Sequence, residues 1–170
     1  MESPTYNTKI KVGMFTFSCC EDSSIMFTIL LGKYFFEWKK RIDFVEARML
    51  RRNRTASQFD VAFVEGAITA DEQIQRLKKI RSMSKLIVAI GSCACTGMPA
   101  AIRNDFSSKQ KQEIEFILDR FQYADKVRKI DEIVKVDKYI PGCPMNTDVF
   151  LKSLNEIFVQ FGLTPVDLNK

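Results

Sequence analysis

The sequence contains no histidine, and this absence removes one of the commonest catalytic and metal-binding side chains. Without imidazole, nucleophilic catalysis by a serine–histidine or cysteine–histidine pair is excluded. Long apolar runs are also missing, because the longest, such as residues 25–31, fall far short of the ~20 residues that span a membrane. The opening MESPTYNTKIK has no apolar signal core either. We therefore expect a soluble, cytoplasmic chain without a transmembrane segment.

The composition is that of a globular domain. The 170 residues are 46% hydrophobic and 28% charged, which is enough to build a core and excludes both a disordered chain and a small disulfide-held domain. A formal charge of +5 is compatible with acidic proteins, nucleic acids or anionic surfaces without choosing among them. Because no basic helix, recognition motif or aromatic strand platform is present, we expect no nucleic-acid partner.

Apolar segments with the character of buried strands alternate with segments of helical spacing. Residues 85–90 (KLIVAI) and 59–64 (FDVAFV) are predominantly apolar, as buried strands of parallel sheets are. Further strands are expected at residues 9–17, 42–50 and 133–140. Serine or threonine is predicted to cap the intervening helices, at Ser23 or Ser24, at Thr69 with Glu72 in a capping box, at Ser107 or Ser108, and at Thr147.

This alternation predicts an α/β fold, a flavodoxin-like doubly wound parallel sheet of five strands with helices on both faces. We expect one domain with a core at residues 9–161, a flexible N-terminal segment at 1–8 and a C-terminal tail at 162–170. Such sheets bind ligands at the carboxyl ends of their strands, where the strand order reverses. The loops after the first, third, fourth and fifth strands are expected to converge there.

Five cysteines are the main chemical feature of the sequence. Their number is odd, and a disulfide between the adjacent Cys19 and Cys20 would close a strained ring, so metal or redox chemistry is favoured over structural disulfides. Cys19 and Cys20 follow the first expected strand, Cys93 and Cys95 the fourth, and Cys143 the fifth. Because these strand ends meet at one edge, we expect thiolates from three loops to surround one metal centre.

Four thiolates without imidazole suit an iron–sulfur cluster or a cysteine-only zinc site. Structural zinc sites usually use paired CxxC motifs, which are absent, so the spacing favours the cluster. Ordinary buried thiols are the alternative, although none of the five falls on a predicted helix face or inside a strand. Gly91, Gly97 and Gly142 would allow close backbone approach to cluster sulfurs, and the helix amino ends after Cys20 and Pro144 would stabilise its negative charge.

Four motifs carry a resemblance to a known family. They are Ser18-Cys19-Cys20, the Val64-Glu65-Gly66 turn, Gly91-Ser92-Cys93-Ala94 and Pro141-Gly142-Cys143-Pro144. In order and spacing, over roughly residues 9–160, they resemble the small subunit of nickel–iron hydrogenases and the related 20 kDa subunit of respiratory complex I. In that family these loops hold the proximal 4Fe-4S cluster. The resemblance implies that the ligands are Cys19, Cys20, Cys93 and Cys143, with Cys95 as a spare thiol.

The first motif departs from the hydrogenase pattern. Hydrogenase small subunits usually have CxxC there, whereas this chain has Cys19-Cys20-Glu21-Asp22, and tandem cysteines resemble the complex I subunit. Either Cys20 replaces the missing ligand, which we favour, or Asp22 supplies a carboxylate, or the site is altered. The Glu65-Gly66 turn and the loop GSCACTGMPA resemble cytosolic, cofactor-linked hydrogenases and sulfhydrogenases.

The resemblance implies an electron-transfer subunit of a nickel–iron hydrogenase that is not active alone. We expect a single 4Fe-4S cluster, since no cysteine follows Cys143. The nickel–iron centre is expected in a partner large subunit, and a further iron–sulfur or flavin subunit is the other expected partner. Two alternatives stay open, a complex I-like subunit that passes electrons to quinone and a cluster-free flavodoxin-like binding module.

Several other residues have two interpretations. Glu65 either lies beside the cluster, where it tunes the potential or helps a proton path, or is a solvated loop residue or a cap. A basic run either docks a partner or is a solvated loop, and it comprises Arg51, Arg52 and Arg54. A set of large apolar residues belongs either to the core or to a subunit interface, and it comprises Met26, Phe27, Phe35, Phe36 and Trp38.

Overall fold

Five parallel strands form the centre of the structure, a computed structural model that describes residues 9–50, 52–53 and 58–168. The expected flexible segment 1–8, the end of the tail, Arg51 and Arg54 lie outside the described residues. The parallel strands lie in the order β2-β1-β4-β5-β6. Their bounds are Ile10–Thr16 for β1, Ile42–Ala47 for β2, Phe59–Glu65 for β4, Ser84–Ile90 for β5 and Lys138–Ile140 for β6.

This order confirms the expected flavodoxin-like winding. The chain runs from β1 outward to β2 and then crosses to the other side of β1 to form β4, so the order reverses at β1. One strand was not expected. A short turn of helix, Arg48–Leu50, ends the segment predicted as strand 42–50, and β3 (Arg52–Asn53) then pairs antiparallel with β2 at the edge of the sheet.

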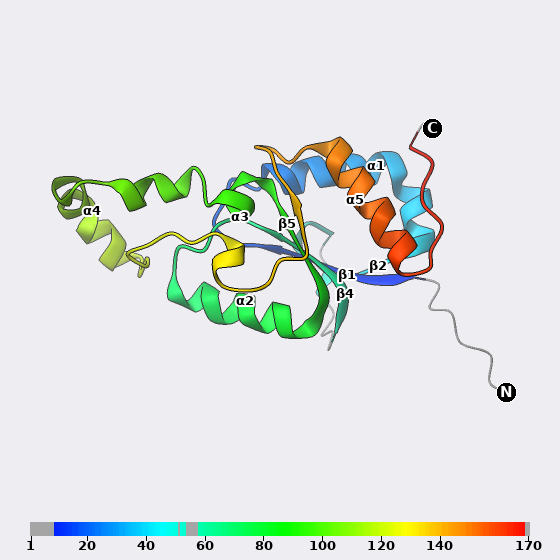
Figure 1. Ribbon diagram of the computed structural model, residues 1–170, viewed down its shortest axis with the longest axis horizontal. Helices are drawn as coiled ribbons and strands as arrows, with labels where there is room; N and C mark the ends of the chain where they lie inside the picture. The colour runs from blue at the N-terminus through cyan, green and yellow to red at the C-terminus, as the bar shows by residue number, and fades with distance from the viewer. Residues whose placement is uncertain (1–8, 51, 54–57, 169–170) are drawn as a thin grey trace.

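Helices cover both faces of the sheet (Figure 1). On one face α1 (Asp22–Arg41) lies beside α5 (Thr147–Gln160). On the other face lie α2 (Asp71–Met83) and the short helix Ile130–Glu132. Two further segments, α3 (Gly91–Thr96) and α4 (Ser108–Arg120), follow β5, with the short helix Ala100–Asp105 between them.

The core between the sheet and the pair α1 and α5 is strongly aromatic. Phe27 stacks on Trp38 at 5.6 Å between ring centroids, and Phe150 contacts both rings as well as Phe63. Phe27 and Trp38 are therefore core residues, in agreement with one of their two interpretations. Phe36 is 78% exposed and Phe35 is also exposed, while Met26 packs at the margin of this core.

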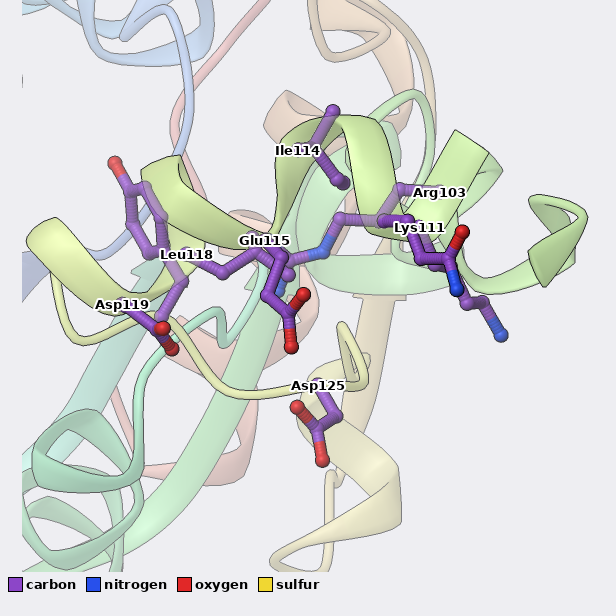
Figure 2. Close-up of a pocket in the computed structure, with 9 residues that line it drawn as sticks. Arg103, Lys111, Ile114, Glu115, Leu118, Asp119 and Asp125 are labelled. Carbon is purple, nitrogen blue, oxygen red and sulfur yellow. The ribbon is translucent and has the colours of Figure 1, made fainter. Parts of the chain in front are cut away.

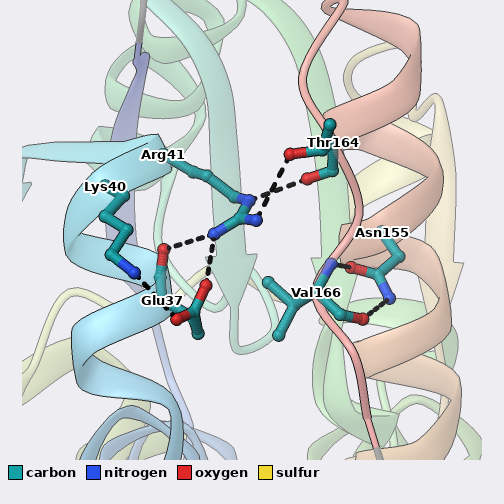
Figure 3. A network of polar contacts seen from close by, with 6 residues as sticks. All are labelled: Glu37, Lys40, Arg41, Asn155, Thr164 and Val166. Atoms are coloured by element: carbon teal, nitrogen blue, oxygen red, sulfur yellow. Dashed lines mark hydrogen bonds and ion pairs between the residues drawn. The ribbon is translucent and has the colours of Figure 1, made fainter.

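The segment after α5 packs back against the same two helices (Figure 3). The Arg41 guanidinium donates to the Thr164 carbonyl at 2.7 Å and to Glu37 on its own helix at 2.8 Å. Asn155 and Val166 exchange a reciprocal pair of hydrogen bonds of 2.9 and 2.8 Å, and the Val166 side chain is buried. These contacts hold the described part of the tail on the α1 and α5 layer.

The predicted strand at residues 133–140 is wrong over most of its length, because only Lys138–Ile140 joins the sheet. The Asp137 carboxylate accepts hydrogen bonds from the Ile87 amide and the Arg81 guanidinium at the edge of β5, so ladder pairing starts just after it. Before that point the chain wraps over the sheet and buries Val134 in the core beneath α2.

Three predicted helix caps differ in the structure. The capping box of Thr69 and Glu72 is wrong: the Thr69 hydroxyl bonds Ser18 at 2.6 Å, and α2 begins after Ala70. Asn146 caps α5 in place of Thr147 by accepting the amides of Asp148 and Val149, whereas Ser107 caps α4 as predicted, in a capping box with Gln110. The cap expected at Ser23 or Ser24 is also wrong, because the side chain that accepts the first amides of α1 comes from Glu65.

Across the part of the chain that the structure describes, no helix combines the length and the apolar character needed to cross a membrane.

Candidate functional site

Three loops at the carboxyl edge of the sheet bring four cysteines around one pocket. Cys19 and Cys20 follow β1, Cys93 lies on α3 directly after β5, and Cys143 follows β6. The pocket has a volume of about 530 Å³ and lies where doubly wound sheets bind their ligands. The structure thus brings together side chains that are more than a hundred residues apart in the sequence.

The remaining wall of this cysteine pocket is mostly apolar, with polar groups from two parts of the chain. Ser18 and Thr69 share the 2.6 Å hydrogen bond between their hydroxyls, and Gln73 donates to Ser18 at 3.1 Å. Arg103 and Tyr123 come from the segment between β5 and β6, and no sequence motif signalled their contribution. The full lining besides the cysteines is Ser18, Thr69, Pro99, Ala100, Arg103, Tyr123 and Val127.

The four thiols differ in exposure. Cys93 is buried, Cys19 is half-buried, and Cys20 and Cys143 are exposed. Burial raises the pKa of Cys19 to about 12, and the nearby Glu65, Cys93 and Cys20 add to the rise. Burial likewise raises the pKa of Cys93, with further contributions from Cys20 and Cys143. Thiolates in this pocket therefore need a positive centre to balance their charge.

Cys95 faces away from the pocket, because the expected loop at 91–99 begins with the helix α3. Residues two apart on a helix do not share a face, so Cys93 lines the pocket while Cys95 packs against the core beneath α2. Its sulfur is 3.5 Å from the Ala89 carbonyl. Burial raises the pKa of Cys95 to about 11.

Glu65 is buried at the end of β4 and fixes the start of α1. Its carboxylate accepts the Ser23 amide at 3.0 Å, the Ser24 amide at 3.1 Å and the Ser24 hydroxyl at 2.6 Å. The helix is thus capped by an acid from a neighbouring strand and not by its own serine, because Glu21 at the cap position has a φ of 65° and makes no side-chain cap. Glu65 is thus a cap, as one interpretation had it, and not a solvated loop residue, while a role beside a bound cluster stays a prediction.

Ser23, at the start of α1, also contacts the segments that carry Cys93 and Cys143. Its hydroxyl accepts the Met145 amide at 3.2 Å, just after Cys143. A side-chain carbon at Gly91, which has a φ of +79°, would lie 2.7 Å from that hydroxyl, and one at Gly142 would lie 2.5 Å from the Pro144 carbonyl. These two glycines are therefore required by positive φ and by close packing between the cysteine loops.

The amides at the start of α1 do not reach into the cysteine pocket, since Glu65 accepts those of Ser23 and Ser24. These two amides are therefore not free to donate hydrogen bonds to a bound cluster, as was expected of this helix end. Asp22 lies outside the pocket, exposed on the first turn of α1.

The side chains around the pocket are of the kind that holds an iron–sulfur cluster. Four cysteines line one pocket whose walls are mostly apolar, and a 4Fe-4S cluster is held by four cysteine thiolates. Over the described residues, no group of three or more cysteine, aspartate and glutamate side chains is placed to hold a single metal ion.

Comparison with known proteins decides the family. A family model described as NADH ubiquinone oxidoreductase, 20 Kd subunit, matches residues 19–157. The chain belongs to this family. The match begins at the first pocket cysteine and includes the other three, so the resemblance inferred from the motifs is confirmed.

Relatives of this 20 kDa subunit family member are hydrogenase subunits. The chain is 25% identical to the NAD-reducing hydrogenase HoxS subunit delta of Cupriavidus necator, over 88% of the chain and 78% of that protein. It is 29% identical to the coenzyme F420 hydrogenase subunit gamma of Methanosarcina barkeri, over 83% of the chain and 51% of that protein. The chain thus spans about half the length of the second relative.

A solved structure has the same fold. A chain of an NAD+-reducing [NiFe]-hydrogenase in the H2-reduced state superimposes with a TM-score of 0.72 at 23% identity, and the match covers 94% of this chain and 95% of that one. The doubly wound sheet that presents the cysteine pocket is therefore shared over almost the whole of both chains.

Proposed function

We propose that this chain is the electron-transfer subunit of a nickel–iron hydrogenase and that it holds one 4Fe-4S cluster through Cys19, Cys20, Cys93 and Cys143. The observation that carries the proposal is the convergence of these four thiols on one pocket at the carboxyl edge of the sheet. The hydrogenase subunits among the relatives support the same assignment. The chain works in the cytoplasm and is not active alone.

When bound, the cluster accepts and donates single electrons. The residues of this chain hold it and set its surroundings. Pro99, Ala100 and Val127 supply apolar wall beside the cysteines, while Glu65 and Ser23 fix the loops that carry the ligands. Burial and nearby charge influence the potential of such a cluster, and Glu65 supplies a buried negative charge close to Cys19 and Cys93.

The partners follow from this role. A large subunit holds the nickel–iron centre and carries out the hydrogen chemistry. A further iron–sulfur or flavin subunit exchanges electrons with the physiological acceptor. This chain lies between the two and provides the relay, so its pocket must be covered by a partner on at least one side.

A second candidate is a complex I-like subunit that passes electrons to quinone. The tandem Cys19 and Cys20 favour it, as does the family description, which is that of an NADH ubiquinone oxidoreductase subunit. The two candidates use the same cluster and differ in the partner that covers it.

The experiment is anaerobic purification of the tagged chain coexpressed with the products of its neighbouring genes. For the wild type we expect a nickel-containing chain to copurify and the complex to reduce a viologen dye with hydrogen. For Cys143→Ser we expect dye reduction to be lost. A copurifying membrane protein with quinone reduction and no nickel would establish the second candidate. A complex with neither metal nor either activity would leave the cluster-free binding module.

A further inference from the structure

Helix α4 is amphipathic, yet none of its residues is buried by the part of the chain that the structure describes. Ile117 is 38% exposed and Phe121 is 60% exposed, and Phe116 on another side of the helix is 69% exposed. Figure 1 shows α4 projecting at one end of the molecule, away from the layers that cover the sheet.

Such a helix needs a packing partner to be stable. A helix of 13 residues is marginal in water on its own, and most helical stability in proteins comes from burying an apolar stripe. The Ser107 and Gln110 capping box supplies only part of the stability that a helix of this length lacks. The stripe has the spacing of a buried helix face and consists of Ile114, Ile117, Leu118 and Phe121.

The space beneath α4 connects this helix to the cysteine pocket. A hollow of about 370 Å³ lies between α4 and the segment that follows it, and Figure 2 shows Glu115 and Asp119 descending from the helix toward the segment that carries Asp125. Arg103 and Tyr123 line both this hollow and the cysteine pocket. The Arg103 guanidinium carbon lies 5.6 Å from the centroid of the Tyr123 ring. A molecule that covers α4 therefore also meets the rim of the cysteine pocket.

The charges of α4 argue against a lipid surface as the occupant. Helices that lie on membranes carry a polar face rich in lysine and arginine. On α4 the basic residues are balanced by acidic ones, namely Lys109, Lys111 and Arg120 against Glu113, Glu115 and Asp119. A mixed polar rim around an apolar centre is typical of an interface between proteins.

We infer that the exposed apolar side of α4 docks the nickel-containing large subunit over the cysteine pocket, and this inference rests on the proposed function because that function requires such a subunit. Continuity through Arg103 and Tyr123 favours this subunit over a second copy of the chain, since the cysteine pocket must face its redox partner. The docking surface consists of Ile117 and Phe121 on the apolar side of α4 and of Tyr123, whose ring centroid lies 6.1 Å from that of Phe121, and all three side chains are exposed.

The test replaces two apolar residues of α4 by acids in the double variant Ile117→Glu/Phe121→Glu. The matched control is Val159→Glu, because Val159 is 60% exposed on α5, whose end lies far from α4 in Figure 1. Each tagged chain is coexpressed with the nickel-containing subunit, and the amount of that subunit retained, the acid-labile sulfide content and the circular dichroism spectrum are measured.

We expect the double variant to retain about tenfold less of the nickel-containing subunit, since loss of central apolar contacts typically weakens an interface by that factor or more. The control is expected to match the wild type, and all three chains should hold the same amount of acid-labile sulfide per chain and, once separated from the partner, give the same helical signal. Undiminished retention in the double variant overturns the inference. If retention is unchanged but the double variant loses a homodimer that the wild type forms in sedimentation, α4 docks a second copy of the chain. If retention is unchanged but the double variant loses binding to anionic vesicles, α4 docks a membrane.

Failure of the proposed function is a separate result. A wild-type complex without acid-labile sulfide would remove the electron-transfer role, whereas the dependence of retention on Ile117 and Phe121 would still establish the docking surface.

Discussion

The Ser24 hydroxyl donates a 2.6 Å hydrogen bond to the buried carboxylate of Glu65, and the Ser24 amide donates to the same carboxylate oxygen at 3.1 Å. This contact joins the start of α1, just after Cys20, to the end of β4. Because β1 and β4 are the neighbouring strands at which the order reverses, Glu65 connects the tandem cysteines to the centre of the sheet. The helix end carries positive partial charge, which the buried carboxylate balances.

Replacement of Glu65 by alanine is expected to lower the free energy of unfolding by about 3 kcal/mol, because three donors lose their acceptor in a buried place. Ser24→Ala removes only the hydroxyl bond and is expected to cost about 1 kcal/mol. Urea unfolding of both variants in the same cluster-loading state measures the difference. A Glu65→Ala variant within about 0.5 kcal/mol of the wild type would show that the carboxylate is not the cap.

Cys93 and Cys95 form a matched pair for testing the ligand set. They lie on the same short helix, but only Cys93 lines the pocket. Cys93→Ser is expected to lose the visible absorption of the cluster, whereas Cys95→Ser keeps it with wild-type iron content. The reverse pattern would mean that α3 presents its other side to the metal.

The tandem motif offers a second comparison. Cys20 lines the pocket, while Asp22 is exposed on the first turn of α1 outside it. We expect Cys20→Ser to lose the cluster and Asp22→Ala to retain both its iron and its reduced electron paramagnetic resonance spectrum. An altered spectrum in Asp22→Ala, with Cys20→Ser unaffected, would make the carboxylate the fourth ligand.

Phe150 is the central ring of the aromatic core and is completely buried. Phe150→Ala is expected to destabilise the chain by about 3–5 kcal/mol through lost burial and the cavity left behind. Phe36→Ala provides the control, since this ring is mostly exposed and its loss should change stability by about 0.5 kcal/mol or less. Equal effects of the two substitutions on the urea midpoint would contradict the assignment of the core.

The sequence predicted the sheet well because its signals are local and strong. Predominantly apolar segments such as Ser84–Ile90 have few alternatives to a buried strand, and the parallel order follows from the alternation with helices. The convergence of Cys19, Cys20, Cys93 and Cys143 followed from the same topology.

Other features depend on contacts between distant residues, which a local pattern does not contain. Glu65 caps a helix that begins more than forty residues earlier in the chain, and Asp137 shortens a strand through Arg81 on another element. The different directions of Cys93 and Cys95 depend on α3, a helix too short to show a periodic pattern. The apolar spacing of α4 was visible in the sequence, but only the structure shows that the described residues leave this side largely uncovered.

The central claim is that the four cysteines of the pocket hold one 4Fe-4S cluster. It is tested most directly by the iron and acid-labile sulfide content of the anaerobically purified complex, together with low-temperature electron paramagnetic resonance after reduction. The account predicts about four iron and four sulfide for this chain and the signal of a reduced cubane, both lost in Cys143→Ser. Iron absent from the intact anaerobic complex, or a cubane signal that persists in Cys143→Ser, would contradict it.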